Sequence, residues 1–221
     1  MTRNKSSLAE RIEETVGNFM SALPEDEART VAGSFEKLYA SKIAEHAINI
    51  GDVAPDFTLP NTAGDPVSLQ ETLRRGPVVL SFYRGGWCPF CNLELHALQA
   101  RLPEIRALGA TLIGISPETP DKAMAAIDEH QLEFEVLSDI GNETARQYGL
   151  LFTVYEEMRP LYLKWGLDVP ASNGDYSWEL PVPATYIIDR NGVVAAAHVD
   201  KDYTKRMEPD TVLATLQALK T

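Results

Sequence analysis

The sequence has little of three things that would mark common classes of protein: cysteine, positive charge and long apolar runs. Two cysteines and four histidines in 221 residues are too few for a scaffold held together by disulfides. The net charge of −12 argues against a nucleic-acid surface or an anionic membrane, since both attract clusters of Lys and Arg. The longest nearly apolar run, 77–83, is far too short to span a bilayer. We therefore expect no nucleic-acid partner and no membrane partner.

The first residues also lack the pattern of a secretory signal. Charged side chains interrupt 1–20 every few positions, so no apolar h-region exists there. We therefore expect a cytoplasmic location. Because that compartment is reducing, a purely structural disulfide is not expected.

Residues before position 49 predict two amphipathic helices. Apolar side chains recur at spacings of three or four over 8–23, and a second such face follows Pro24 over 31–43. We interpret 1–48 as an N-terminal helical extension of a domain that covers 49–221. The extension either covers the core of that domain or forms the interface of a homodimer, because its apolar faces need something apolar to contact.

From about residue 50 the pattern changes to alternating strands and helices. The apolar run 78–83 predicts a central strand that is covered on both faces. Asn191-Gly192 predicts a hairpin between strands over 185–189 and 193–198. A βαβ unit that is followed by an antiparallel hairpin and a final helix is the thioredoxin-like α/β arrangement, with helices on both faces of the sheet.

The segment 151–182 is long for a connection inside one domain and carries six aromatic residues. We interpret it as an aromatic-rich insertion within the 49–221 domain. Packing of these aromatics onto the core is favoured over a surface for substrate or partner.

Both cysteines lie in the motif Trp87-Cys88-Pro89-Phe90-Cys91, after a buried strand and at the start of a predicted helix over 89–108. Their spacing puts Cys88 and Cys91 on one face of the first turn, close enough for a disulfide. The free N–H groups and partial positive charge of the helix N-terminus stabilise a thiolate. Pro89 sets helical φ where its missing N–H costs little. We interpret the motif as a redox-active dithiol.

Metal binding is an alternative use for two cysteines at this spacing. A zinc site needs about four ligands, and the sequence has neither a second pair of cysteines nor paired histidines. A structural disulfide would close only a tiny loop. We expect no metal and no cofactor.

Five further stretches form a recognisable set, at 51–57, 79–83, 114–118, 137–139 and 185–192. Together they resemble the peroxiredoxin-like AhpC/TSA family over about residues 50–219. The resemblance implies a thioredoxin-like fold and a thiol-based antioxidant peroxidase.

The chain also departs from that family. In the family's P-x-x-x-T-x-x-C loop, Arg84 lies at the proline, Cys88 at the threonine and Cys91 at the peroxidatic cysteine. Arg84 either substitutes electrostatically for what is missing or is a solvated loop arginine. The family's arginine before the strand 185–189 is replaced by Pro183, as in thioredoxins. That likeness implies a cis Val182–Pro183 bond against the dithiol, and the alternative is a trans proline that ends a loop.

Three functions fit this combination. The first is a peroxide reductase, in which a Cys88–Cys91 disulfide forms and an external thiol such as thioredoxin or glutathione reduces it. The second is a protein-disulfide oxidoreductase, and the third is a redox-sensing module that binds a partner. In the first two, Cys88 is the expected attacking sulfur because it lies at the mouth of the helix.

Overall fold

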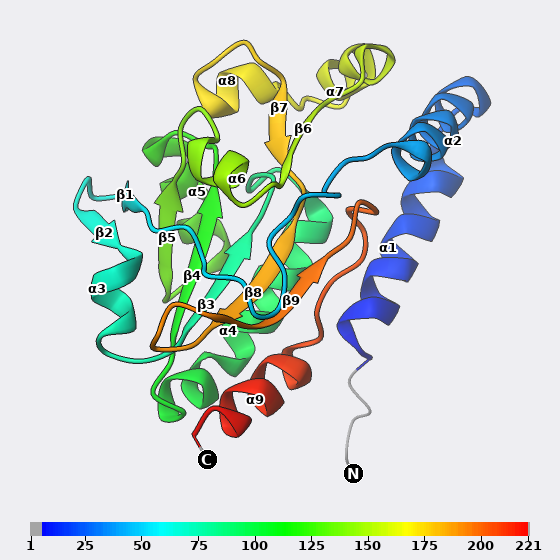
Figure 1. Cartoon of the computed structure of the whole chain (residues 1–221). Coiled ribbons are helices and arrows are strands. Elements are labelled where there is room, and N and C mark those ends of the chain that lie inside the picture. The colour runs from blue at the N-terminus through cyan, green and yellow to red at the C-terminus, as the bar shows by residue number, and fades with distance from the viewer. Residues whose placement is uncertain (1–5, 221) are drawn as a thin grey trace.

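The computed structural model describes residues 6–220 and is built around one five-stranded sheet (Figure 1). Strand β3, in the centre, is parallel to its neighbour β4 and antiparallel to its neighbour β8. Every residue of β3 is buried, so the predicted central strand is confirmed. The strands in sheet order are β5 (Glu135–Ser138), β4 (Thr111–Ser116), β3 (Val78–Phe82), β8 (Ala184–Ile188) and β9 (Val194–Val199).

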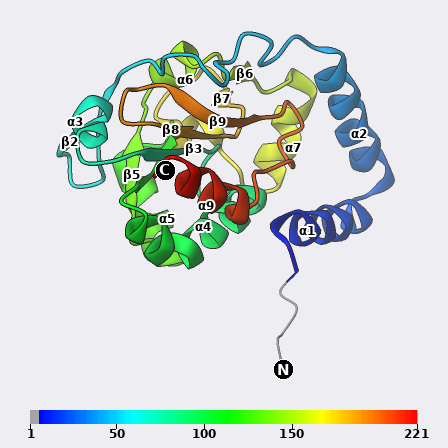
Figure 2. The ribbon, with the colours of Figure 1, turned by 60° about the horizontal axis from the view of Figure 1, so that its bottom comes forward.

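Helices cover both faces of this sheet, as expected for the thioredoxin-like class. Figure 2 shows α4 (Pro89–Ala107), α5 (Pro120–His130) and α9 (Pro209–Ala218) gathered on one face, where they enclose a core with α1. The opposite core is closed by α3 (Leu69–Leu73) and α6 (Glu143–Gln147). Each face of the sheet therefore has its own apolar core, and the expected α/β fold is confirmed.

Two shorter elements complete this part of the chain. Strands β1 (Thr58–Pro60) and β2 (Pro66–Ser68) form a small antiparallel pair outside the main sheet. The predicted hairpin joins β8 and β9, which pair antiparallel with an irregular register at Ile187 and Ile188. Within 6–220, no helix is long and apolar enough to cross a membrane.

The two predicted N-terminal helices are present as α1 (Leu8–Ala22) and α2 (Glu25–Ala40). Ser7 begins α1 through a capping box with Glu10, in which each side chain accepts the other residue's backbone N–H. The carboxylate of Glu208 accepts the next two N–H groups, at 3.1 and 2.8 Å.

The apolar face of α1 packs against α4 and buries Leu8 and Ile12 in the core. The extension therefore covers the core of its own chain. A homodimer through the same helices, and the division of the chain at residue 48, stay predictions.

The segment 151–182 forms a compact unit beside the end of the sheet (Figure 1). Its buried side chains make a third apolar core with Val31 of α2. The aromatics of this segment are buried or half-buried except Tyr176, which is 94% exposed. Its elements are β6 (Leu151–Thr153), the 3₁₀ turn η1 (Glu156–Met158), α7 (Arg159–Lys164), α8 (Val169–Asn173) and β7 (Glu179–Pro181).

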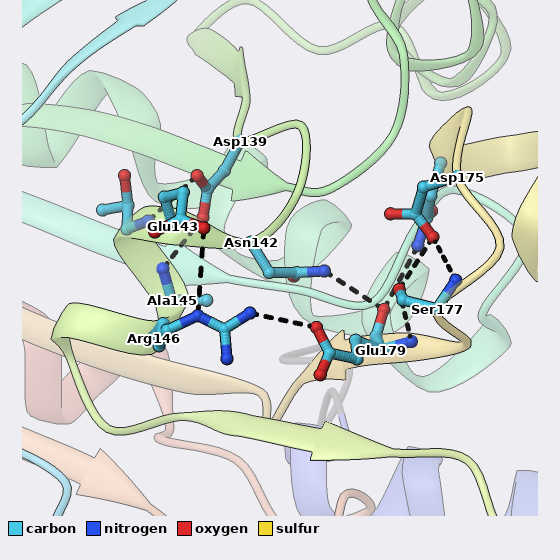
Figure 3. Close-up of polar contacts among 10 residues, drawn as sticks. Asp139, Asn142, Glu143, Ala145, Arg146, Asp175, Ser177 and Glu179 are labelled. Atoms are coloured by element: carbon cyan, nitrogen blue, oxygen red, sulfur yellow. Dashed lines mark hydrogen bonds and ion pairs between the residues drawn. The ribbon is translucent and has the colours of Figure 1, made fainter.

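Polar contacts around Glu179 fasten this segment to the start of α6 (Figure 3). The side-chain amide of Asn142 donates to the backbone carbonyl of Glu179 at 3.2 Å, and Arg146 pairs with the Glu179 carboxylate at 3.1 Å. Asp139 lies before the same helix and accepts the backbone N–H groups of Thr144 and Ala145 within it. These contacts fasten β7 of the segment to α6 and the turn before it.

Candidate active site

The dithiol lies where the sequence predicts it, at the N-terminus of α4. Cys88 is the N-cap residue, and its backbone carbonyl accepts the N–H of Asn92 at 3.0 Å. The thiol and the backbone N–H of Cys91 both favour the ionised form of Cys88. Both thiols are free, and only 1% of Cys88 and none of Cys91 is exposed. The geometry suits a thiolate at Cys88 with a neutral thiol at Cys91.

An arginine whose side chain is buried contacts each sulfur. Arg84 approaches the Cys88 sulfur at 3.8 Å, and Arg206 approaches the Cys91 sulfur at 3.5 Å. Burial disfavours a charge on Cys88, but the polar groups of Cys91 and the two guanidinium groups outweigh it and place the Cys88 pKa well below that of a free thiol. Burial raises the pKa of Cys91, and the neighbouring Cys88 sulfur raises it further. The two cysteines are therefore suited to different steps of one reaction.

Aromatic side chains hold Arg84 in place. Its guanidinium lies over the rings of Tyr203, at 4.4 Å, and Trp87, at 5.0 Å, and donates to the hydroxyl of Tyr162. Only 2% of Arg84 is exposed, so it is not a solvated loop arginine. Trp87 directly precedes Cys88 in the sequence. Its ring contacts the guanidinium of Arg84, which in turn approaches the Cys88 sulfur.

Arg206 is anchored by an acid that the sequence reasoning did not single out. Glu94, one helical turn after Cys91, forms a fully buried ion pair with Arg206 at 2.5 Å and accepts the hydroxyl of Thr185 at 2.8 Å. Glu94 could have been singled out from the sequence, because it is an acidic residue three positions after Cys91 and so lies on the same face of the helix. No local pattern marks Arg206, which comes from the irregular loop 200–208.

The loop between β3 and α4 is pinned at Gly86. Its N–H donates to the carboxylate of Glu118 at 2.8 Å, and its carbonyl accepts from the side chain of Asn92 at 2.7 Å. A Cβ at this position would lie 2.5 Å from the Cβ of Ala126 on α5. Close packing and two hydrogen bonds therefore fix the loop that carries Cys88.

We expect Gly86→Ala to destabilise the protein by about 1–3 kcal/mol, the usual cost of forcing an extra methyl group into a packed site. Urea unfolding measures this loss. The double variant Gly86→Ala/Ala126→Gly removes the clash and should recover part of it, with the remainder set by glycine inside α5, about 1 kcal/mol. If the single variant is as stable as the wild type, the contact between the loop and α5 is not a constraint.

The structure corrects one expectation about the site. The Val182–Pro183 bond is trans, as is every peptide bond over the part of the chain that the structure describes. Pro183 lies in extended backbone between β7 and β8, where the chain continues without reversing direction, so the more stable trans form fits. Pro183 is buried, and its contact with a sulfur stays a prediction.

Among residues 6–220, no group of three or more His, Cys, Asp and Glu side chains is placed to hold a metal ion. His96 on α4 and His130 at the end of α5 place ring nitrogens 3.2 Å apart.

A central sheet whose middle strand leads into a helix beginning Cys-Pro-Phe-Cys defines a thiol protein of the thioredoxin fold class. Comparison with known proteins narrows this class to one family. Residues 50–197 match the AhpC/TSA family, and this chain belongs to that family.

Relatives within the family are similar over most of the chain. Chloroplastic peroxiredoxin Q of Arabidopsis thaliana is 32% identical over 174 residues, which are 78% of this chain and 68% of that protein. Its counterpart in Gentiana triflora is 30% identical over 181 residues, 81% of this chain and 72% of that protein. The crystal structure of peroxidoxin BcpB from Mycobacterium tuberculosis has a TM-score of 0.62 at 25% identity, covering 79% of this chain and 99% of that one.

Proposed function

We propose that this protein is a dithiol peroxidase, in which Cys88 attacks a peroxide and Cys91 resolves the product. The observation that carries the proposal is the paired geometry of the site: each sulfur contacts its own buried arginine, and the pKa values of the two thiols are driven in opposite directions. The family and the named peroxiredoxin relatives support the same class of reaction.

The reaction divides into two steps. The Cys88 thiolate attacks one peroxide oxygen, the O–O bond breaks, and the departing oxygen takes up a proton, which leaves a sulfenic acid on Cys88. The Cys91 sulfur then attacks the Cys88 sulfur, so an S–S bond forms, the S–O bond breaks, and water leaves. One proton and one peroxide are consumed for each disulfide. An external thiol restores the dithiol by exchange through a mixed disulfide.

Burial of the dithiol favours a small substrate over a protein disulfide. Both sulfurs are enclosed, with at most 1% of either cysteine exposed, so a protein substrate has no surface to contact in this state. A cavity of about 580 Å³ opens between α1, α2 and the loop 200–208, and Arg206 lies on its wall. Arg206 links this cavity to the Cys91 sulfur, and a molecule as small as a peroxide fits the cavity.

The external thiol belongs to the proposal as well. A reducing compartment such as the cytoplasm would supply it, as thioredoxin or as a small thiol of the glutathione kind. The acidic surface implied by the net charge of −12 gives no reason to add a nucleic-acid or anionic membrane partner.

Turnover of hydrogen peroxide and of insulin disulfides, measured side by side with the same reductant, tests this assignment. We expect peroxide consumption with formation of one Cys88–Cys91 disulfide per peroxide, and little reduction of insulin. The opposite ratio would make the protein a protein-disulfide oxidoreductase, the alternative that the Cys-x-x-Cys motif supports.

A further inference from the structure

A buried carboxyl group, Glu118, lies beside the dithiol and has no part in the steps described so far. It follows β4, is 3% exposed, and accepts the N–H of Gly86, two residues before Cys88. A carboxyl group in such a place costs free energy when it is charged. Its hydrogen bond to the loop that carries Cys88 connects it to the reacting sulfur.

The polar groups around Glu118 come from three directions. From β3 and β4, Tyr83 and Ser116 present buried hydroxyls without an ordinary hydrogen-bond partner among the residues described, and Ser116 lies close enough to lower the pKa of both Glu118 and Tyr83. From α5, Lys122 favours the ionised carboxylate, and from the start of α4 the Cys88 thiolate opposes it.

The balance among these groups brings the pKa of Glu118 close to neutral pH. Burial raises its pKa most, the N–H of Gly86 and the charge of Lys122 lower it, and the Cys88 thiolate raises it again, to about 7 in sum. The Cys88 contribution exists only in the reduced protein. When the disulfide forms, that negative charge disappears, so the carboxyl group becomes more acidic.

We propose that Glu118 exchanges a proton with the dithiol cycle, being protonated beside the Cys88 thiolate and ionised once the Cys88–Cys91 disulfide has formed. Disulfide formation by peroxide consumes one proton, and its reduction by an external thiol returns one. Glu118 releases a proton in the first half-cycle and regains it in the second. It can therefore supply the proton that oxidation consumes and take up the proton that reduction returns. It acts as a positioning residue, since it reaches the reacting sulfur through Gly86 and through charge.

This inference rests on the dithiol cycle of the proposed function but not on the identity of the oxidant. Reduction of the disulfide adds two electrons and one proton at Cys91 while Cys88 stays a thiolate. One proton for two electrons changes the reduction potential by about 30 mV for each pH unit. A second proton on Glu118 steepens this dependence toward about 60 mV over the range between its two pKa values.

The test is the reduction potential of Cys88–Cys91 as a function of pH in the wild type and in Glu118→Gln. Equilibration with dithiothreitol, followed by alkylation and mass measurement, gives the potential without any peroxide. We expect the wild type to show the steeper slope just below pH 7, where Glu118 is protonated in the reduced protein and ionised in the oxidised one. Glu118→Gln should follow about 30 mV for each pH unit over the same range. The amide oxygen of the glutamine still accepts the Gly86 N–H, so the loop is preserved.

Glu129→Gln is the matched control, because it removes an exposed carboxylate from the same helix that carries Lys122. It should keep the wild-type slope. Equal slopes in the wild type and Glu118→Gln would overturn the inference. If the wild type fails to reduce peroxide but the slopes still differ, the proton exchange stands and the peroxidase assignment falls.

Discussion

Cys88→Ser is expected to abolish peroxide reduction, whereas Cys91→Ser should keep a reactive thiol that stops at the sulfenic acid. The thiol and backbone N–H of Cys91 and two nearby guanidinium groups all lower the pKa of Cys88, so its thiolate is strongly favoured. Serine at position 91 can still donate its hydroxyl and backbone N–H. In Cys88→Ser the remaining thiol is Cys91, which lies inside the first turn of the helix, where burial raises its pKa.

Alkylation with iodoacetamide at pH 7 measures the difference. A thiol with an ordinary pKa of about 8.5 is roughly 3% thiolate at this pH, while one well below 7 is almost fully ionised. Cys91→Ser should therefore react about 30-fold faster than Cys88→Ser, or more, because burial moves Cys91 further from ionisation. A mass increase of one oxygen after peroxide treatment should appear only in Cys91→Ser.

The opposite result has a clear meaning. If Cys88→Ser keeps the fast thiol and is the variant oxidised by peroxide, Cys91 is the peroxidatic sulfur. That is the position it takes in the family's P-x-x-x-T-x-x-C alignment. The roles of Arg84 and Arg206 would then be exchanged as well.

The dithiol was predictable because the physics that activates it is local. A buried strand, a short loop and a helix start lie consecutively in the sequence, and helix geometry alone brings Cys88 and Cys91 together. The same holds for the central strand and for the Asn-Gly hairpin, whose patterns depend on neighbouring residues. Arg84 could be named as a candidate because it lies four residues before Cys88 in the sequence. The aromatic side chains that surround it could not be predicted in this way.

The rest of the site depends on contacts between distant parts of the chain. Arg206 contacts a sulfur 115 positions away, and Tyr162 reaches Arg84 across 78 positions. Neither lies in a periodic pattern, since one belongs to an irregular loop and the other to a short helix in the aromatic segment. At Pro183 the prediction from the sequence was wrong. A likeness to thioredoxins implied a cis Val182–Pro183 bond, but the bond is trans.

Arg206→Met is the second substitution for which we expect a large effect, because it removes charge from two partners at once. The carboxylate of Glu94, 1% exposed, loses its ion pair and keeps only the Thr185 hydroxyl. Breaking a buried pair from one side costs about 3–5 kcal/mol. The loss of the guanidinium also raises the Cys88 pKa, so alkylation near neutral pH should slow.

The double variant Arg206→Met/Glu94→Gln separates these two effects. Removing both charges should restore most of the stability, since the amide of glutamine can still accept from Thr185 and no charge is left unpaired. It should not restore the thiol, because the Cys88 sulfur still lacks the second guanidinium. Urea unfolding reads the first effect and the pH dependence of iodoacetamide alkylation reads the second. Arg206→Lys, which keeps a positive charge near both partners, should lie between the wild type and Arg206→Met in both measurements. Recovery of fast alkylation together with stability in the double variant would show that Arg206 only supports the fold and does not tune the dithiol.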